Sequence, residues 1–412
     1  MKAVIVGSGV AGPATALFLQ RIGCQVEIVE AIADAESSAG AFLNVASNGQ
    51  AVLAELGLQD RLLADAHLAP RMVMWSGLGK RLGEVPNGPA GDHGRGSAVV
   101  RRAWLHQVLR DAVAVAGIAV ATGSRVTTVA EHGEQLVARS ENGREFVGDI
   151  VIGADGVGSA VRRFVDPTAQ RPSYSGLVGL GGYAHGTGLA PTPLTQHFVF
   201  GRRSFFGYLV RDDGTVFWFG NLTHPEVSRD QLRAVPADTW LARLRDLHRD
   251  DLDPVPAILA AADHSVGAYA IYDLPVVPRW HRGHAVCIGD AVHATSPSAG
   301  QGASLALEDA QLLAQTLRDT DRPAAAFDLF YRLRHARAEA VVAYARTIRD
   351  QKMTSTSRLA MVVRDLMLPI FLRKAASDTT QNWLYDYHVD WTTRLQATTT
   401  AATLTDTTTP AS

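Results

Sequence analysis

"AVIVGSGVAGPATALFLQRIGCQVEIVE", residues 3–30, decides the fold. A short apolar run at residues 3–6 indicates a buried strand and leads directly into a glycine-rich turn at residues 7–12. A helical stretch follows, and a second strand at residues 26–30 ends in the carboxylate of Glu30. Strand, glycine turn, helix and strand, with an acid about 20 positions after the glycines, are typical of a dinucleotide-binding unit.

Each glycine of this turn has a distinct physical task. Gly7 permits the tight turn, Gly9 lets the backbone approach a pyrophosphate, and Gly12 lets the helix pack closely on the strand. The start of the helix then faces the phosphates, and Glu30 accepts hydrogen bonds from ribose hydroxyls. The unit predicts a bound dinucleotide but does not distinguish NAD(P) from FAD.

A second segment makes that distinction. Residues 283–289 indicate another strand, and Asp290 lies just past its carboxyl end, where ligands of open α/β sheets bind. Gly300-Gln301-Gly302 then opens a helix whose free N–H groups carry partial positive charge. A reduced flavin is negative at one edge of its ring and carries a polyol chain, which Asp290 can bind, whereas a nicotinamide dinucleotide has neither feature. The two segments therefore predict FAD, held at both ends.

Composition limits the other possibilities. A chain of 412 residues with 47% hydrophobic and 19% charged residues is typical of a globular protein of two or three domains. A net charge of −2 argues against nucleic acid or an anionic membrane as the main partner. Cys24 and Cys287 are too few for a disulfide framework or a cysteine-ligated metal, so we expect two buried thiols, no metal and a cytoplasmic protein. Glycines and Pro13 interrupt the N-terminal apolar run, which disfavours a signal peptide, and no apolar window is long enough for a membrane span.

Three motifs in order resemble the FAD-dependent single-component (group A) aromatic hydroxylases of the para-hydroxybenzoate hydroxylase type, over the chain to about Trp391. They are the glycine turn with Glu30, "GADGVGSAVR" at residues 153–162, and "GDAVHATSPSAGQGASLALEDA" at residues 289–310. The resemblance implies that the second motif serves both FAD and NAD(P)H, and that the third contacts the ribityl chain and the flavin ring.

Two weaker matches and two departures accompany this resemblance. Arg102 with Leu105 and Leu109 is similar to a family pattern whose arginine lies near the pyrophosphate, and residues 40–44 with 56–58 resemble a second cofactor-side segment. Ala31 stands where the family often has a basic residue. Ser304 stands where it often has Asn, which leaves a side-chain contact to the flavin there in question.

Several residues also have plain structural interpretations. Asp155 can cap the helix that begins near Ser159 as well as serve a cofactor. His293 is expected to be a packed, hydrogen-bonded histidine rather than a catalytic one. Glu308 and Asp309 are interpreted as a solvated or locally hydrogen-bonded helix face, and the arginines of the next helix as a solvated face: Arg332, Arg334 and Arg337.

The middle of the chain changes to alternating, aromatic-rich strands. "TQHFVFG", "SFFGYLV" and "TVFWFG" are separated by turn residues and predict an antiparallel sheet with aromatic side chains on one face. Most of these aromatics are expected to be core, and part of the face to cover a flat ligand. No spacing selects a catalytic base among the candidates His185, His197, His224, Tyr183 and Tyr208, so the catalytic residue stays unknown.

The predicted fold is α/β: a Rossmann-like FAD-binding domain with an inserted antiparallel-sheet substrate domain and C-terminal helices. The predicted FAD-binding domain is discontinuous and consists of residues 1–70, 95–171 and 276–350. The substrate-binding sheet domain consists of residues 71–94 and 172–275. Residues 351–391 are expected to form a C-terminal helical segment, and residues 392–412 a disordered Thr-rich tail.

The resemblance implies a monooxygenase that uses FAD, NADH or NADPH, and O2, and hydroxylates an aromatic or polycyclic small molecule through a flavin C4a-hydroperoxide. Alternatives are epoxidation, Baeyer–Villiger oxidation or reduction on the same fold, a plain NAD-dependent dehydrogenase, or a non-catalytic nucleotide-binding protein. Substrate, oligomeric state and the choice of NADH or NADPH stay open. The predicted cofactor-binding residues are Gly7, Gly9, Val10, Ala11, Gly12, Glu30, Ala41, Arg102, Val126, Asp155, Asp290, Pro297, Gly300, Gln301, Gly302 and Ala303.

Overall fold

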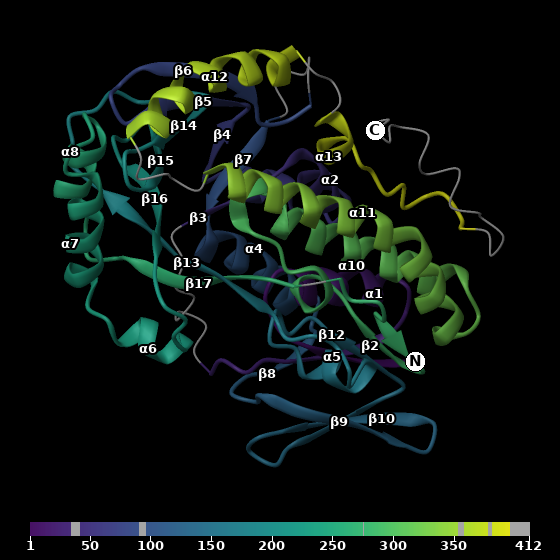
Figure 1. Ribbon diagram of the computed structural model, residues 1–412. Helices are drawn as coiled ribbons and strands as arrows, with labels where there is room; N and C mark the ends of the chain where they lie inside the picture. Colours follow the sequence, from purple (N-terminus) through teal and green to yellow (C-terminus); the bar gives the residue numbers. More distant parts are fainter. Residues whose placement is uncertain (34–41, 90–95, 275, 353–357, 378–380, 396–412) are drawn as a thin grey trace.

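The computed structural model describes residues 1–33, 42–89, 96–274, 276–352, 358–377 and 381–395. Two large sheets organise this part of the chain, and long helices run beside and between them (Figure 1). Among the helices described, none combines the length and the apolar character needed to cross a bilayer.

The first sheet has six strands in the order β18-β19-β12-β1-β2-β8. Every neighbouring pair is parallel except β18 with β19. β1 lies near the centre and its last four residues are buried, which explains its continuous apolar sequence. The strands are β1 (Lys2–Val6), β2 (Gln25–Val29), β8 (Ala119–Ala121), β12 (Ile150–Gly153), β18 (His281–Arg282) and β19 (Ala285–Cys287).

Helices of the N-terminal and C-terminal thirds pack against this sheet and each other. α10 lies against both α1 and α11, so that segments almost 300 residues apart in sequence share one core (Figure 1). Both cysteines are buried there as free thiols, as predicted. The helices in this layer are α1 (Ala11–Arg21), α4 (Arg102–Val115), α5 (Ala160–Val165), α9 (Asp290–His293), α10 (Gly302–Asp319) and α11 (Pro323–Lys352).

The second sheet has seven strands in the order β17-β13-β16-β15-β14-β5-β6. It is antiparallel as predicted, except that β14 pairs with β5 in parallel. The exception arises because β5 and β6 come from an earlier segment that joins the free edge of β14. The strands are β5 (Arg71–Ser76), β6 (Arg81–Pro86), β13 (Ser173–Ala184), β14 (Thr195–Phe200), β15 (Phe205–Val210), β16 (Val216–Thr223) and β17 (Gly267–Asp273).

The two faces of this second sheet differ in what covers them. One face forms a core with three helices, where the rings of Phe206 and Trp218 stack with centroids 6.0 Å apart. The opposite face carries Leu209 and Phe217 and packs against Phe42 of β3. The covering helices are α6 (Arg229–Ala234), α7 (Ala237–His248) and α8 (Val255–Ala260).

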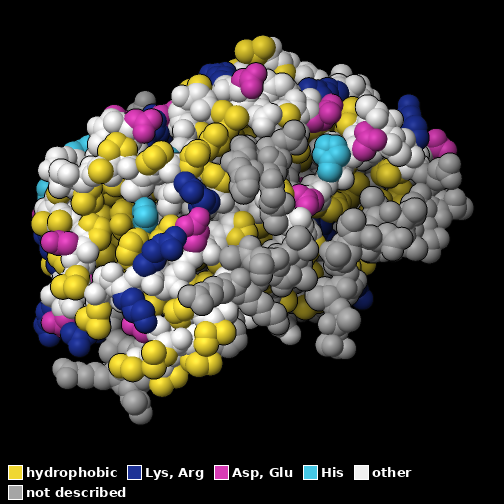
Figure 2. Space-filling model, turned by 90° about the horizontal axis from the view of Figure 1, so that it is seen from above, with side chains coloured by type: hydrophobic (Ala, Val, Ile, Leu, Met, Phe, Trp, Pro, Cys, Tyr) yellow, Lys and Arg dark blue, Asp and Glu magenta, His cyan; other side chains and the backbone are white. Residues whose placement is uncertain are grey.

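Smaller elements complete the architecture. α12 packs on β6, while five large apolar side chains of α12 stay exposed, and Figure 2 looks onto this side of the molecule. Two three-stranded sheets, β3-β7-β4 and β11-β10-β9, lie beside the first sheet. The remaining elements are β3 (Phe42–Val45), α2 (Ser47–Glu55), α3 (Gln59–Leu63), β4 (Ala66–Ala69), β7 (Ser97–Arg101), β9 (Val126–His132), β10 (Gln135–Ser140), β11 (Glu145–Gly148), η2 (Pro297–Ala299), α12 (Arg358–Ser377) and α13 (Asn382–Tyr385).

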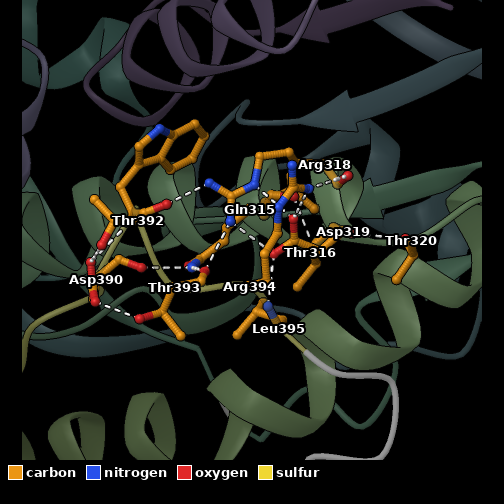
Figure 3. A network of polar contacts seen from close by, with 12 residues as sticks. Gln315, Thr316, Arg318, Asp319, Thr320, Asp390, Thr392, Thr393, Arg394 and Leu395 are labelled. Atoms are coloured by element: carbon orange, nitrogen blue, oxygen red, sulfur yellow. Dashed lines mark hydrogen bonds and ion pairs between the residues drawn. The ribbon is translucent and has the colours of Figure 1, made fainter.

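Residues 390–395 form a strap across the end of α10 (Figure 3). Gln315 donates to the carbonyls of Asp390 and Thr393, and Asp319 accepts from the backbone N–H of Leu395 at 2.8 Å. Trp391 lies against Phe18 of α1, with ring centroids 5.0 Å apart. The first residues of the predicted Thr-rich tail, 392–395, belong to this strap, and 396–412 lie outside the described residues.

We expect Trp391→Ala to lower the free energy of unfolding by about 2–4 kcal/mol, because it removes the ring that joins the strap to α1. Chemical denaturation measures this change. Val115→Ala, at a side chain that is 90% exposed, is the control and should shift stability by less than about 0.5 kcal/mol. Equal effects of the two changes would show that the strap does not stabilise the fold.

Candidate active site

The carboxyl ends of three adjacent strands bring the three sequence motifs together. After β1, the carbonyl of Val6 accepts from Ala154 N–H at 2.8 Å, and after β12 the carbonyl of Gly153 accepts from Ile288 N–H at 2.9 Å. The loops that follow therefore start side by side at one edge of the first sheet. This is the edge at which ligands of open α/β sheets bind.

Two glycines of the first motif are required by close backbone contacts. Gly7 has φ 107°, and a Cβ there would lie 2.3 Å from the carbonyl oxygen of Ala154. A Cβ on Gly12 would lie 1.9 Å from the carbonyl oxygen of Gly7. Gly9 differs, because a Cβ there would meet nothing within 4 Å. The turn is thus closed on the protein side and open on the side where the sequence predicts a pyrophosphate.

Other predicted residues of the adenosine side occupy varied places. Glu30 accepts from the N–H groups of Ser8 and Ile32, both at 2.7 Å, so its carboxylate also holds the glycine loop. Val10 is the N-cap of α1 and Ala11 is buried in its first turn, while Val126 is buried at the start of β9. Ala41 lies outside the described residues.

The second motif caps a helix, as its structural interpretation predicted. Asp155 Oδ2 accepts from Ala160 N–H at 2.6 Å, beside Ser159, the N-cap of α5. Asp155 Oδ1 is buried and has no partner among the described residues. Burial raises the pKa of this carboxyl, and the hydrogen bonds oppose the rise.

Asp290 is the first residue of α9, and its carboxylate has no hydrogen-bond partner among the described residues. Asp290 is exposed. Desolvation by the surrounding protein, and the charge of Asp309, raise the pKa of Asp290, while His293 and Arg102 lower it. Arg102, at the exposed start of α4, therefore lies within electrostatic reach of Asp290.

The predicted flavin-side helix start is formed as expected. Pro297 is exposed and opens η2, Gly300 is left-handed with φ 64°, and Gln301 is the buried N-cap of α10. Gly302 and Ala303 begin α10 and are half-buried. The doubtful position, Ser304, points away from the cleft, because its hydroxyl accepts from Ala46 N–H at 3.0 Å.

A buried network of charges lies behind this helix start. Asp309 Oδ2 accepts from Gly289 N–H at 2.8 Å and contacts His293 Nε2 at 2.6 Å, while its other oxygen pairs with Arg334. Glu308 pairs with Arg334 and with Arg337. All of these side chains except Arg337 are less than 5% exposed. The network fixes the turn that presents Asp290.

This network corrects one expectation and confirms another. Arg334 and Arg337 do not form a solvated face, because α11 turns them onto α10, where the otherwise costly burial of Glu308 and Asp309 is offset by opposite charges. The i, i+3 spacing of the two arginines was the available signal. His293 is packed and hydrogen bonded, as predicted.

The second sheet carries an aromatic surface on the face opposite α7 and α8. Phe42 contacts Phe217 and Phe219, with ring centroids 5.5 and 5.8 Å apart. Tyr269 of β17 lies over Gly179, where a Cβ would come within 2.5 Å of its ring. Tyr269 is 39% exposed and within electrostatic reach of Arg102. Tyr269 is not among the residues predicted from the sequence, although the alternating pattern of residues 267–273 indicates its position on this face.

The candidate bases lie on different faces of the second sheet. His197 and Tyr208 stack with centroids 5.0 Å apart, and Tyr208 belongs to the core beneath α7 and α8, on the far side of the sheet. His224 lies beside Trp240 of α7. Tyr183, which contacts Phe217 at 4.9 Å, is the candidate on the cleft side, and His185 lies at the exposed strand end beyond it.

These features fit FAD. An open glycine turn, a carboxylate without a hydrogen-bond partner among the described residues, and the half-buried start of α10 lie along one edge of the first sheet. The donor set matches a ligand with a pyrophosphate, a polyol and a ring that becomes anionic on reduction. Fold and site together define a dinucleotide-binding flavoprotein with an attached aromatic sheet.

Comparison with known proteins leads to the same class. A family model described as "FAD binding domain" matches residues 1–182 and 261–345, more than half of the chain. The chain belongs to this FAD-binding family.

Two curated relatives are similar over most of their length. One is the aurachin C monooxygenase/isomerase of Stigmatella aurantiaca, 28% identical over 79% of this chain and 83% of the relative. The other is the FAD-dependent urate hydroxylase of Klebsiella pneumoniae subsp. pneumoniae, 28% identical over 84% and 89%. The crystal structure of Klebsiella pneumoniae HpxO with FAD and uric acid superposes with a TM-score of 0.77 at 25% identity, covering 92% of this chain and 96% of that one.

The predictions of an α/β FAD-binding fold and of a group A hydroxylase relationship are therefore confirmed. The protein is an FAD-dependent monooxygenase, for which NAD(P)H and O2 are the typical cosubstrates. This excludes the plain dehydrogenase and the non-catalytic binding protein.

We expect Asp309→Asn to destabilise the fold by about 3–5 kcal/mol at pH 7, because buried Arg334 keeps Glu308 but loses its second carboxylate, and His293 loses a charged partner. Burial alone would raise the pKa of Asp309, but His293 and Arg334 lower it to about 2. A carboxyl with a depressed pKa stabilises the fold above its unfolded pKa and loses that contribution as the pH falls toward 2. The difference between wild type and variant should therefore shrink below about pH 4.

Denaturant titrations of both proteins between pH 7 and pH 2 measure this difference. Asp212→Asn, at an exposed turn residue, serves as the control for loss of one carboxylate. A difference that stays constant down to pH 2 would contradict the assigned role of the Asp309 charge.

Proposed function

We propose that the protein hydroxylates a flat aromatic or heteroaromatic small molecule bound between the FAD and the aromatic face of the second sheet. One observation carries the proposal: Arg102 is close enough to influence both Asp290, on the cofactor side, and Tyr269, on the sheet side. The common influence of Arg102 supports a single cleft lined by cofactor groups and aromatic rings. The related urate hydroxylase acts on a fused heterocycle, which supports this substrate class.

We propose further that FAD lies along the edge described above, with its adenosine end at β1 and its ring at α10. The proposed division of the chain follows from this: residues 71–94 and 172–275 supply the substrate sheet. The proposed FAD contacts are Gly7, Gly9, Val10, Ala11, Gly12, Glu30, Ala41, Arg102, Val126, Asp155, Asp290, Pro297, Gly300, Gln301, Gly302 and Ala303.

The residues of the cleft have two chemical tasks. Bound FAD supplies the redox chemistry that couples a reduced nicotinamide to O2. The N–H groups at the start of α10 stabilise negative charge that develops on the neighbouring ring, since they carry the positive end of the helix dipole. Phe42, Phe217 and Phe219 would keep water away from the flavin ring, which would limit loss of the oxidising equivalent as hydrogen peroxide.

Two phenols are placed to orient a polar group of the substrate. Burial raises the pKa of both Tyr183 and Tyr269, and the charge of Arg102 opposes the rise at Tyr269. Both phenols therefore stay protonated at neutral pH, where each donates a hydrogen bond to an oxygen or ring nitrogen. We propose Tyr269 as the closer of the two to the flavin, because the charge of Arg102 acts on both Tyr269 and Asp290.

We also propose a cytoplasmic protein that draws NADH or NADPH from solution, in keeping with the two buried free thiols. The purified protein with its FAD should oxidise NAD(P)H slowly alone and faster with a suitable aromatic ligand. Mass spectrometry should then find a product heavier by one oxygen atom. Stimulated NAD(P)H oxidation with a reduced or unaltered product, over a panel of aromatic compounds, would contradict the hydroxylase function.

Asp290→Ala should weaken FAD binding roughly 10- to 150-fold, because it removes a charged hydrogen-bond acceptor of the polyol. The ratio of flavin to protein absorbance and titration of the flavin-free protein measure this. Asp212→Ala is the matched control. Undiminished FAD binding by the Asp290 variant would show that this carboxylate does not bind FAD.

Tyr269→Ala should raise the fraction of NAD(P)H that is consumed without hydroxylation, since water then enters the cleft. Tyr269→Phe should keep the cleft dry but raise KM for a substrate that accepts from the phenol. Peroxide release and product yield separate the two effects. Tyr208→Phe, the same change on the opposite face, should alter neither, and an equal effect there would contradict the assignment of faces.

A further inference from the structure

Four arginines from three separate elements lie near one another. They are Arg102 at the start of α4, Arg125 just before β9, and Arg229 and Arg233 of α6. Arg229 lies close enough to the other three for their charges to act on it: partial burial lowers the pKa of Arg229, and the neighbouring arginines lower it further. Asp230 is an acidic neighbour that opposes them.

These arginines lack the partners that other arginines of the chain have. Arg102, Arg229 and Arg233 make no hydrogen bond or ion pair with any described residue, and Arg125 has only an exposed contact with Glu141 at 3.7 Å. Arg101, in contrast, donates to Asp65 at 2.8 Å. The whole chain carries a net charge of −2, so this positive group is a local feature. Like charges held together without acids cost free energy, which an anionic ligand relieves.

The geometry of α6 presents two of these charges together. Ser228 and Gln231 form a capping box that fixes the first turn of α6. Arg229 and Arg233 are four residues apart, so they lie on the same side of the helix, and both are exposed. α6 packs against β17, the strand that carries Tyr269. The pair therefore borders the proposed cleft from the substrate sheet.

The FAD pyrophosphate does not account for this pair. We assign the pyrophosphate to Arg102 and the open amide turn at Gly9, whereas Arg229 and Arg233 belong to α6, which covers the second sheet. They also lie outside the segments 1–182 and 261–345 that match the FAD-binding family. The positive group thus extends past the cofactor toward solvent, where a second phosphorylated ligand approaches.

We propose that Arg229 and Arg233, with Arg125 beside them, bind the phosphate groups of the reduced nicotinamide dinucleotide. The proposal rests on the proposed function in taking NAD(P)H as the cosubstrate. Guanidinium groups suit this ligand, because they donate two parallel hydrogen bonds to one phosphate. The site would hold the nucleotide transiently from the solvent side while its nicotinamide reaches the flavin.

The test compares wild type with the double variant Arg229→Gln/Arg233→Gln, both loaded with FAD. Arg243→Gln/Arg249→Gln, on and just after α7, removes the same charge elsewhere on the substrate sheet unit and is the control. Titration calorimetry with adenosine 2′,5′-bisphosphate and with ADP measures phosphate binding without any turnover. Anaerobic reduction by NADH and by NADPH measures the nucleotide concentration at half-saturation and the limiting rate.

We expect the double variant to bind the probe nucleotides roughly 10- to 100-fold more weakly than the control, with flavin content retained. The half-saturating NAD(P)H concentration should rise by a similar factor at a retained limiting rate. A loss restricted to NADPH and the bisphosphate assigns the pair to the 2′-phosphate, and an equal loss for NADH assigns it to the pyrophosphate.

Binding as tight as in the control would overturn the site, and so would loss of FAD, which would assign the pair to the flavin cofactor. A wild-type protein that binds FAD but is reduced by neither NADH nor NADPH would instead contradict the proposed function, and the nucleotide site with it.

Discussion

The pairing of Glu308 and Asp309 with arginines of α11 is the constraint on which the rest of the site depends. Two carboxylates buried side by side would repel each other and could not stay ionised without compensation. Arg334 and Arg337 supply it, and Asp309 then has an oxygen free to hold the Gly289 amide. The same interaction that joins two helices thus sets the direction of the turn leading into Asp290.

Close backbone contacts act together with this pairing. A Cβ on Gly289 would lie 3.3 Å from the Cβ of Ala11 and 3.6 Å from that of Ala306. The first and third motifs are therefore packed together, although they are separated by most of the chain. One rigid edge results, with the start of α1 and the start of α10 presented to the same side.

Local patterns made much of this predictable. The glycine turn, the strand-end acids and the helix start are each encoded within about 30 residues, so the sequence alone indicated the first sheet and both ends of the proposed FAD site. Pairings between distant segments were not predictable. The partners of Arg334 lie on another helix, the parallel pairing of β14 with β5 joins separate segments, and the group around Arg229 combines residues from three separate elements.

The ring-over-glycine contacts of the second sheet have a consequence for divergence. Gly207 lies under Phe219, and a Cβ there would come within 2.2 Å of that ring. Gly179 stands in the same relation to Tyr269. Alanine at position 207 requires a smaller side chain at position 219, so the glycine and the aromatic residue are expected to change together during evolution. A change in the shape of this face would therefore need paired substitutions, in which the aromatic residue is replaced by a smaller one first.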